Sequence, residues 1–392
     1  MVRLRYEPFL GSYLVMEDGE LYAISPADLP EVLTELPNTV IVRNSEYPEG
    51  IFSAPLKVQI QTTKICNLKC KTCAVFGGEC NAATMQMGSE QIIQLIEKIA
   101  SMGVLNLEWS GGEPLLRKDF WTFVPYAAGL GISQNLLTNG TCFTQKNVAL
   151  LSSFYRIQIS LDGVGETFNR IVGRNAWEIF LRSMDLIQGI GLSIVMATVL
   201  QKENVDHLNE IIDFCIAHNL PKVRISLQVP IGRSVSISWE EYSRVIDKFR
   251  ECLPSLKKRA TDGGVELDVF LEKRICDDTT VADVSRIVSP GGYSFLYIDA
   301  IGDVYPFPFL TQPFLRLGSC ISDDLQEIWL RSTILSSIRQ QTYRNTDCGE
   351  CRYECSFAER SLVVGFTGRI DGPAMPHPEC QNRKEVMSPC QK

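Results

Sequence analysis

The sequence predicts an α/β fold in which β-α units repeat around a parallel sheet. Between residues 54 and 255, apolar runs of strand length alternate with segments of helical length, which is the pattern of successive parallel β-α units. A hydrophobic content of 45% beside 21% charged residues is typical of a folded globular chain. The expected strands cover residues 57–62, 105–109, 133–138, 156–161, 192–199 and 222–229.

The segment after the first expected strand predicts an amphipathic helix over residues 89–101. Ile92, Ile96 and Ile99 recur at helical spacing and would form one apolar face. Ser89 is expected to cap the first turn, since a serine oxygen can accept from the free amide groups there. This helix would connect the first two strands of the sheet.

Residues 1–53 and 256–392 depart from the β-α pattern and are expected to form two further units. Near the N-terminus, strand-like runs flank Asp18 and Gly19, and an Asp-Gly pair favours a tight hairpin. Residues 1–53 are therefore predicted to form a small leader element. Beyond residue 255 the regular alternation stops, which predicts a separate C-terminal domain.

Charge and composition limit the partners and the compartment. The net charge of −8 comes from intermixed acids and bases, and the absence of a Lys/Arg-rich run argues against nucleic acid. The N-terminus carries Arg3, Arg5 and Glu7 and has no long apolar run, which argues against a signal peptide or a membrane span. We expect a cytoplasmic protein. In that reducing compartment the 14 cysteines are better candidates for metal ligation than for disulfides.

Three of these cysteines follow the first expected strand with C-x3-C-x2-C spacing. Cys66, Cys70 and Cys73 could bind three irons of a cubane cluster and leave the fourth iron open to an outside ligand. Their loop falls at the C-terminal end of a strand, where parallel β-α barrels place their active sites. A [4Fe-4S] cluster is the favoured interpretation. A zinc site and unligated thiols are the alternatives, because C-x2-C pairs also bind structural zinc.

With this motif on this loop, the sequence resembles the radical S-adenosylmethionine superfamily across the β-α series. The resemblance implies a partial (β/α)6 TIM-like barrel and a cluster whose fourth iron is chelated by S-adenosylmethionine. It further implies reductive cleavage of S-adenosylmethionine, fed by a flavodoxin or ferredoxin-type donor, and a 5′-deoxyadenosyl radical that abstracts a substrate hydrogen atom. Thr72 stands where the family usually has an aromatic residue, so that residue's adenine contact is not expected here.

The resemblance also assigns S-adenosylmethionine contacts to residues at the ends of the next strands. Gly111 and Gly112 would let the backbone approach the methionine amino group, and Glu113 would supply an anion for it. Arg170 is the expected partner of the methionine carboxylate, with Arg174 as the alternative. The expected cofactor-binding residues are Gly111, Gly112, Glu113, Pro114, Asn139, Ser160, Asp162 and Arg170.

A second group of cysteines lies near the C-terminus, and its four thiols could close a cluster or a zinc site completely. The group resembles the extension called SPASM or twitch, and residues 298–306 resemble the strand-turn-strand segment of that extension. Phe307 stands where the extension often carries a cysteine, so the resemblance implies one auxiliary Fe-S cluster. Structural zinc and no metal are the alternatives. The expected ligands are Cys348, Cys351, Cys355 and Cys380.

For function, the family resemblance favours a radical enzyme that modifies a ribosomally made peptide. One alternative is a radical dehydrogenase or rearrangement enzyme acting on a small sugar-like metabolite. Another is a non-enzymatic Fe-S electron-transfer or scaffold protein, which would not cleave S-adenosylmethionine. The remaining dispersed cysteines, such as Cys142, Cys215 and Cys252, are expected to be small buried apolar side chains.

Overall fold

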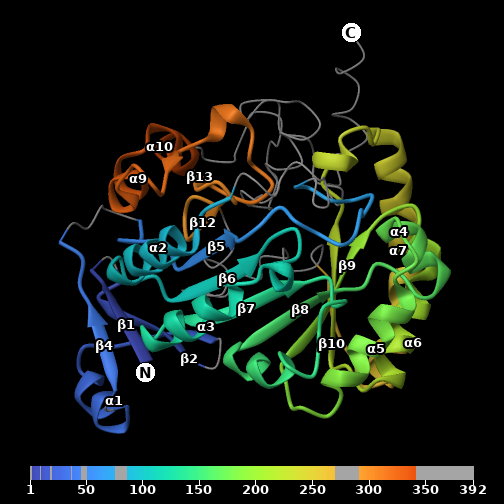
Figure 1. Ribbon diagram of the computed structural model, residues 1–392, viewed down its shortest axis with the longest axis horizontal. Coiled ribbons are helices and arrows are strands. Elements are labelled where there is room, and N and C mark those ends of the chain that lie inside the picture. Colours follow the sequence, from blue (N-terminus) through green and yellow to red (C-terminus); the bar gives the residue numbers. More distant parts are fainter. Residues whose placement is uncertain are drawn as a thin grey trace.

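The computed structural model describes residues 2–8, 10–17, 20–36, 38–45, 51–75, 86–269 and 291–340. These residues form a sheet of ten strands and a smaller sheet of four, with helices around them (Figure 1). Within the described ranges, no helix is both long enough and apolar enough to cross a membrane.

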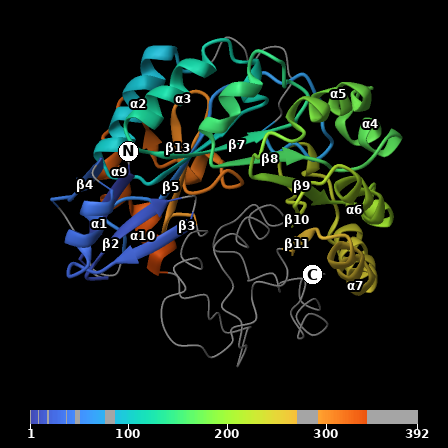
Figure 2. The ribbon, with the colours of Figure 1, turned by 90° about the horizontal axis from the view of Figure 1, so that it is seen from below.

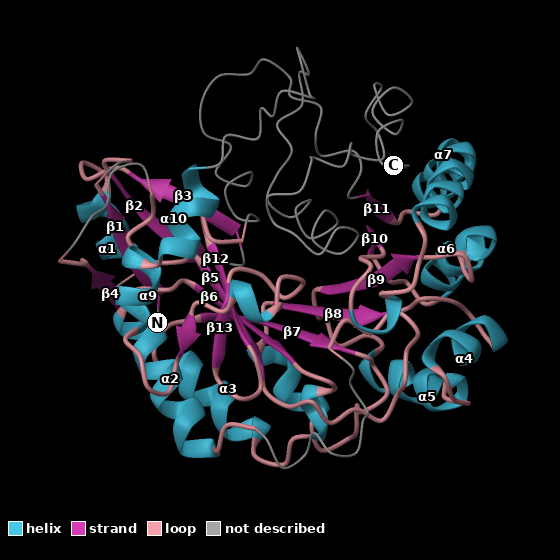
Figure 3. Ribbon diagram, turned by 90° about the horizontal axis from the view of Figure 1, so that it is seen from above, coloured by secondary structure: helices cyan, strands magenta, loops and turns pink. Residues whose placement is uncertain are grey.

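The larger sheet confirms the predicted α/β fold. Its neighbouring strands are parallel from β11 through β12, and the six predicted strands are β5 to β10. The strands form an open arc, as in a partial barrel (Figure 3). In sheet order the strands are β11 (Glu266–Val269), β10 (Lys222–Leu227), β9 (Ile194–Leu200), β8 (Arg156–Ser160), β7 (Ser133–Thr138), β6 (Asn106–Ser110), β5 (Lys57–Gln61), β12 (Phe295–Ile298), β13 (Asp303–Tyr305) and β14 (Gly318–Ser319).

Helices cover the outer side of this arc (Figure 3). Their apolar faces pack on the strands and form one continuous core with them. The loops that follow the C-terminal ends of the strands are not covered by these helices, and β-α barrels build their active sites from such loops. The helices are α2 (Ser89–Ser101), α3 (Phe120–Gly129), α4 (Glu166–Val172), α5 (Trp177–Ile187), α6 (Leu208–Ala217) and α7 (Trp239–Asp262).

Helix α2 has the predicted bounds, but its N-terminus differs from the prediction. Gly88 occupies the N-cap position, and its amide donates to Oε1 of Gln91 at 2.8 Å. Ser89 is already the first helical residue and its hydroxyl donates to Asp119, so the expected serine cap is wrong. The helix begins one residue too early for that role. The buried residues of α2 are Ile92, Leu95, Ile96, Ile99 and Ala100.

The strand-turn-strand predicted over residues 298–306 is confirmed as the antiparallel hairpin of β12 and β13. Because β12 pairs in parallel with β5, this hairpin continues the barrel sheet instead of starting a separate one. Two helices follow, α9 (Leu325–Arg331) and α10 (Thr333–Gln340). Helix α7 runs through residue 255, so the expected boundary there falls inside a helix. The domain division itself stays a prediction.

The N-terminal residues form the smaller sheet, called here the leader sheet, with one helix, α1 (Leu29–Glu35). The predicted hairpin is confirmed as the antiparallel pair β2–β3, while its turn residues 18 and 19 lie outside the described residues. The leader sheet lies beside α9 and α10 at one end of the arc (Figures 2 and 3). In sheet order its strands are β3 (Glu20–Ile24), β2 (Ser12–Glu17), β1 (Val2–Glu7) and β4 (Thr39–Val42).

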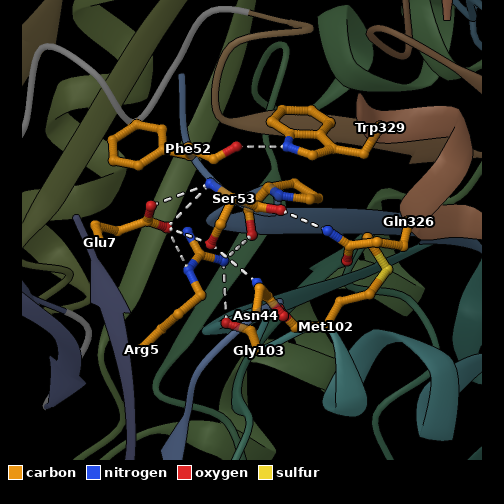
Figure 4. A network of polar contacts seen from close by, with 10 residues as sticks. Arg5, Glu7, Asn44, Phe52, Ser53, Met102, Gly103, Gln326 and Trp329 are labelled. Atoms are coloured by element: carbon orange, nitrogen blue, oxygen red, sulfur yellow. Dashed lines mark hydrogen bonds and ion pairs between the residues drawn. The ribbon is translucent and has the colours of Figure 1, made fainter. Parts of the chain in front are cut away.

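A buried ion pair joins the leader sheet to the barrel (Figure 4). Arg5 Nε and Glu7 Oε1 on β1 lie 2.7 Å apart, and both side chains have no exposed surface. The Arg5 guanidinium donates to the Gly103 carbonyl at 3.0 Å, just before β6. The Glu7 carboxylate accepts from the amide and the hydroxyl of Ser53, both at 3.0 Å. The pair is therefore tied to the segment that leads into β5 and to the segment that leads into β6.

The segment that leads into β5 also contacts α9 (Figure 4). The indole of Trp329 donates to the Phe52 carbonyl at 2.7 Å, and the amide of Gln326 donates to the Ser53 carbonyl at 2.8 Å. Residues far apart in the sequence therefore meet around Phe52 and Ser53.

Candidate active site

The parallel register brings the C-terminal ends of the central strands to one edge of the sheet. Gln61 at the end of β5 pairs with Ser110 at the end of β6, for example. The loop after β5, called here the cysteine loop (residues 62–75), carries Cys66, Cys70 and Cys73 at this edge. All three cysteines are half-buried.

Burial of these thiols opposes the loss of their protons, whereas two N–H donors beside Cys66 favour its ligation to an iron-sulfur cluster. Burial raises the pKa of the Cys66 thiol to about 11 and also raises that of Cys70, and the other thiols of the loop add to both shifts. The Leu68 amide and the Asn139 side chain donate to Cys66 Sγ at 3.4 and 3.7 Å. Such N–H donors stabilise thiolate and cluster sulfur, and each thiol must lose its proton before metal binds.

The loop does not by itself preassemble a metal site. Among the residues that the structure describes, no three Cys, His, Asp or Glu side chains come together in metal-binding geometry. The assignment of Cys66, Cys70 and Cys73 as ligands therefore stays a prediction. The other predicted ligands fall outside the described residues: Cys348, Cys351, Cys355 and Cys380.

The glycine-rich loop after β6 packs directly on the cysteine loop. The Gly112 amide donates to the Thr63 carbonyl at 2.6 Å, and the Glu113 amide donates to the Ile65 carbonyl at 2.7 Å. A Cβ atom on Gly112 would lie 2.3 Å from the Ile65 oxygen, and one on Gly111 would lie 3.0 Å from the Thr63 oxygen. Glycine at position 112 is thus required by the chain that leads into Cys66.

The Glu113 carboxylate has partners inside the protein. Its Oε1 accepts from the Thr138 hydroxyl at 2.8 Å and its Oε2 accepts from the Asn139 amide at 2.7 Å. The side chain has no exposed surface, and burial raises the pKa of its carboxyl to about 7. Pro114 then begins a short 3-10 turn. This carboxylate ties the β6 loop to the β7 loop, a contact that was not predicted.

Asn139, which follows β7, connects that strand end to the cysteine loop. Its Nδ2 donates to Asn67 Oδ1 at 2.9 Å as well as to Cys66 Sγ. The Asn67 Nδ2 in turn donates to the Thr141 hydroxyl at 2.8 Å. Cys142 follows, and burial raises the pKa of its thiol to about 12. Asn139 is therefore placed beside the first cysteine of the motif.

At the end of β8, Ser160 and Asp162 differ in exposure. Ser160 is exposed, whereas Asp162 is buried and its Oδ1 accepts from the Val199 amide at 2.7 Å. The Asn204 side chain donates to the Asp162 carbonyl at 2.9 Å. Burial raises the pKa of the Asp162 carboxyl to about 7, and its charge also acts on Cys70.

Helix α4 supports the middle of the cysteine loop. The carbonyls of its last two residues accept from the amides of Lys69 and Lys71 at 2.9 and 3.0 Å. These bonds satisfy carbonyls that a helix C-terminus otherwise leaves open. The Arg174 guanidinium donates to the Asn67 carbonyl of the cysteine loop at 2.8 Å, whereas that of Arg170 donates to the Thr167 hydroxyl of its own helix at 3.3 Å; both side chains are exposed. The two candidate partners of a carboxylate thus lie in different settings.

The loop after β10 supports the far end of the cysteine loop through the short turn η5 (Gly232–Ser234). The Arg233 amide donates to the Cys73 carbonyl at 3.0 Å, and its guanidinium donates to the Cys70 carbonyl at 3.2 Å. These contacts were not predicted. The feature of the sequence that could have indicated these contacts is Gly232, which lies shortly after the sixth expected strand, at the edge of the sheet where the cysteine loop lies.

A half-buried three-cysteine loop lies at the C-terminal edge of an open parallel barrel and is braced by a Gly-Gly-Glu-Pro loop, which is the arrangement that the resemblance to radical S-adenosylmethionine enzymes implies. Residues 60–215 match the family model described as the Radical SAM superfamily. These residues therefore form a radical SAM domain, as the cysteine motif predicted.

Two curated relatives align over most of the chain. Mycofactocin maturase MftC of Mycolicibacterium smegmatis is 26% identical over 356 residues, which cover 86% of this chain and 84% of MftC. An AdoMet-dependent heme synthase of Oleidesulfovibrio alaskensis is 25% identical over 320 residues, which cover 75% and 79% of the two chains.

A solved structure of similar fold is Streptococcus suis SuiB bound to S-adenosylmethionine. It superposes with a TM-score of 0.67 at 16% identity and covers 90% of this chain and 92% of its own. SuiB bound to its precursor peptide SuiA gives the same TM-score. At this identity the likeness concerns the fold, and it extends beyond the radical SAM domain.

Proposed function

We propose that this radical SAM enzyme modifies a ribosomally made peptide. The observation that supports the radical chemistry is the cysteine loop, which lies at the C-terminal ends of the parallel strands. The loops after β6, β7 and β10 and helix α4 hold it there. The peptide substrate is supported by the maturase MftC and by SuiB, whose structure contains a precursor peptide.

In this proposal Cys66, Cys70 and Cys73 bind a [4Fe-4S] cluster that S-adenosylmethionine completes. When bound, this pair supplies one-electron cleavage of the sulfonium bond and a 5′-deoxyadenosyl radical that takes a hydrogen atom from the substrate. A flavodoxin or ferredoxin-type donor would provide the electron. A cytoplasmic location, where such donors are kept reduced, belongs to the same proposal.

The chain's own residues would bind and orient S-adenosylmethionine around this loop. The backbone of Gly111 and Gly112 would meet the methionine amino group, and Glu113 would keep that backbone in position from inside the protein. Ser160, exposed at the end of β8, suits the ribose hydroxyls. Arg170 is exposed and suits the methionine carboxylate, and Arg174, which is also exposed, is the alternative.

We further propose that residues 256–392 include a SPASM or twitch-like extension with one auxiliary Fe-S cluster. Its candidate ligands are Cys348, Cys351, Cys355 and Cys380. Iron counting on anaerobically reconstituted protein tests this cluster. Cys348→Ala and Cys351→Ala should each lower the iron content, and an unchanged content in both variants would remove the auxiliary cluster from the proposal.

The radical chemistry is tested by anaerobic reconstitution followed by reduction in the presence of S-adenosylmethionine. Wild-type protein should form 5′-deoxyadenosine, and Cys70→Ala should form none. Cys215→Ala is the matched control, since this thiol is buried in α6 away from the loop, and it should retain iron and product. Wild-type protein that carries a full cluster yet forms no 5′-deoxyadenosine would favour the scaffold alternative.

The substrate class is tested with short peptides encoded beside the gene. A matching peptide should increase 5′-deoxyadenosine formation and should change in mass in the same reaction. If only small metabolites, such as porphyrins or sugars, stimulate the reaction, the peptide assignment is wrong while the radical chemistry stands.

A further inference from the structure

The turn between Cys70 and Cys73 is contacted at two points by one residue of the loop after β10, Arg233. Arg233 donates its amide to the Cys73 carbonyl at 3.0 Å and its guanidinium to the Cys70 carbonyl at 3.2 Å. Within the turn, the Cys73 amide lies 3.3 Å from the same Cys70 carbonyl. One side chain therefore brings a permanent cation to the backbone that carries both thiols.

The approach of Arg233 depends on the glycine before it. Gly232 has φ of +57°, and a Cβ atom there would lie 2.3 Å from the Cys73 oxygen and 2.6 Å from the Ala74 oxygen. The next residue, Ser234, is buried and accepts from the Gln228 side chain at 2.8 Å. The turn η5 is thus fixed on both sides of Arg233, in close contact with the cysteine loop.

A cation at this place has a definite consequence for a cluster bound by these thiols. One-electron reduction adds negative charge to the cluster, and nearby positive charge favours the more negative state. Asp162 is the opposing charge, because its carboxyl also acts on Cys70. The two residues place charges of opposite sign around the same ligand.

We propose that Arg233 is a positioning residue that holds the Cys70–Cys73 turn and raises the reduction potential of the cluster. The proposal rests on the proposed function only in that Cys66, Cys70 and Cys73 bind the cluster. The Arg233 cation would therefore make it easier for the cluster to accept the electron that starts the reaction.

The test is a redox titration of the reconstituted cluster, followed by electron paramagnetic resonance without S-adenosylmethionine. Arg233→Gln keeps an amide donor but loses the charge, and should make one-electron reduction about tenfold less favourable, a downward shift of ~59 mV. Arg233→Lys keeps a cation and should restore most of the potential. Arg182→Gln, which removes an exposed guanidinium that donates to the Glu178 carbonyl of its own helix α5, should leave the potential unchanged.

Each outcome decides the proposal. An unchanged potential in Arg233→Gln with full iron content overturns it, and so does an equal shift in Arg182→Gln. If Arg233→Gln loses its iron, Arg233→Lys decides: full iron with a wild-type potential supports the proposal, and a lowered potential contradicts it. These readings do not require turnover. A lack of 5′-deoxyadenosine in wild type would therefore refute the proposed function separately.

Discussion

Gly112 is the residue at which the geometry of the site is least tolerant of change. Its backbone lies so close to the Ile65 carbonyl that the added methyl group of Gly112→Ala cannot be accommodated without moving the strand exit before Cys66. We expect this variant to lose most of its cluster iron and about 1–3 kcal/mol of stability, as overpacked sites do. Iron analysis and urea unfolding measure the two effects.

The matched control is Gly129→Ala, because nothing lies within 4 Å of a Cβ atom placed there. This glycine ends helix α3, so alanine should leave the iron content unchanged and be neutral or slightly stabilising. Full iron in Gly112→Ala, or equal losses in both variants, would contradict the close contact between the two loops.

At the residue scale, what could be predicted depended on sequence spacing. Three thiols within eight positions after a strand are a local pattern, and so is a Gly-Gly-Glu-Pro loop after the next strand. The partners of Glu113 were not predictable, because whether a carboxylate faces a ligand or the interior depends on side-chain direction. Arg233 was missed since its contact with Cys70 joins loops 163 positions apart.

At the scale of elements, the buried pair of Arg5 and Glu7 fixes the leader sheet on the barrel. Glu7→Gln would leave the Arg5 guanidinium buried without its counter-charge. Breaking a buried pair in this way costs about 3–5 kcal/mol, so urea unfolding of the cluster-free protein should show a much lower stability.

The control for this change is an ion pair at the surface. Glu240 and Arg244 are exposed on α7, so Glu240→Gln should change the stability by less than about 0.5 kcal/mol. If Glu7→Gln is no less stable than Glu240→Gln, the ion pair does not anchor the leader sheet.

The elements themselves were predictable to different degrees. Strands β5 to β10 follow from apolar runs separated by helical segments, and each lies within two residues of its predicted bounds. The place of β12 could not be predicted, because its parallel partner β5 precedes it by more than 230 residues and the regular β-α alternation stops before β12. Strand β11, which extends the sheet past the last expected strand, was not predicted either, because it is short and half polar.

At the scale of the whole molecule, Trp329 connects helix α9 to the segment before β5, which lies 277 positions earlier in the sequence. Trp329→Phe removes the indole that donates to the Phe52 carbonyl, and the loss of this buried hydrogen bond costs about 0.5–1.5 kcal/mol. Because Phe52 adjoins the Arg5–Glu7 network, we expect leader sheet and barrel to unfold together at a lower midpoint. Circular dichroism and fluorescence transitions should coincide.

Tyr126→Phe is the control for Trp329→Phe, since it removes an exposed hydrogen bond to Glu97 and should shift the midpoint little. Two separate transitions in wild-type protein would show instead that the leader sheet unfolds on its own.

The two buried carboxyls of the site predict how stability depends on pH in the cluster-free protein. Burial raises the pKa of Glu113 from 4.5 to about 7 and that of Asp162 from 3.8 to about 7. Native protein therefore binds more protons than unfolded protein between these values, and its stability should fall as pH rises from about 4 to 7. The combined loss is on the order of a few kcal/mol. Above pH 7 both states are ionised and this contribution becomes constant.

Substitution separates these two groups from the other titrating residues. Glu113→Gln and Asp162→Asn cannot ionise, so each variant should lose part of the fall in unfolding free energy between pH 4 and 7 that wild type shows. Glu240→Gln, which changes an exposed carboxyl, should keep the wild-type slope. Urea unfolding at several pH values gives the slopes. A wild-type slope in both site variants would mean that the carboxyls of Glu113 and Asp162 ionise as easily in the folded chain as in water. The C-terminal ends of β6 and β8 would then be more hydrated than their packing indicates.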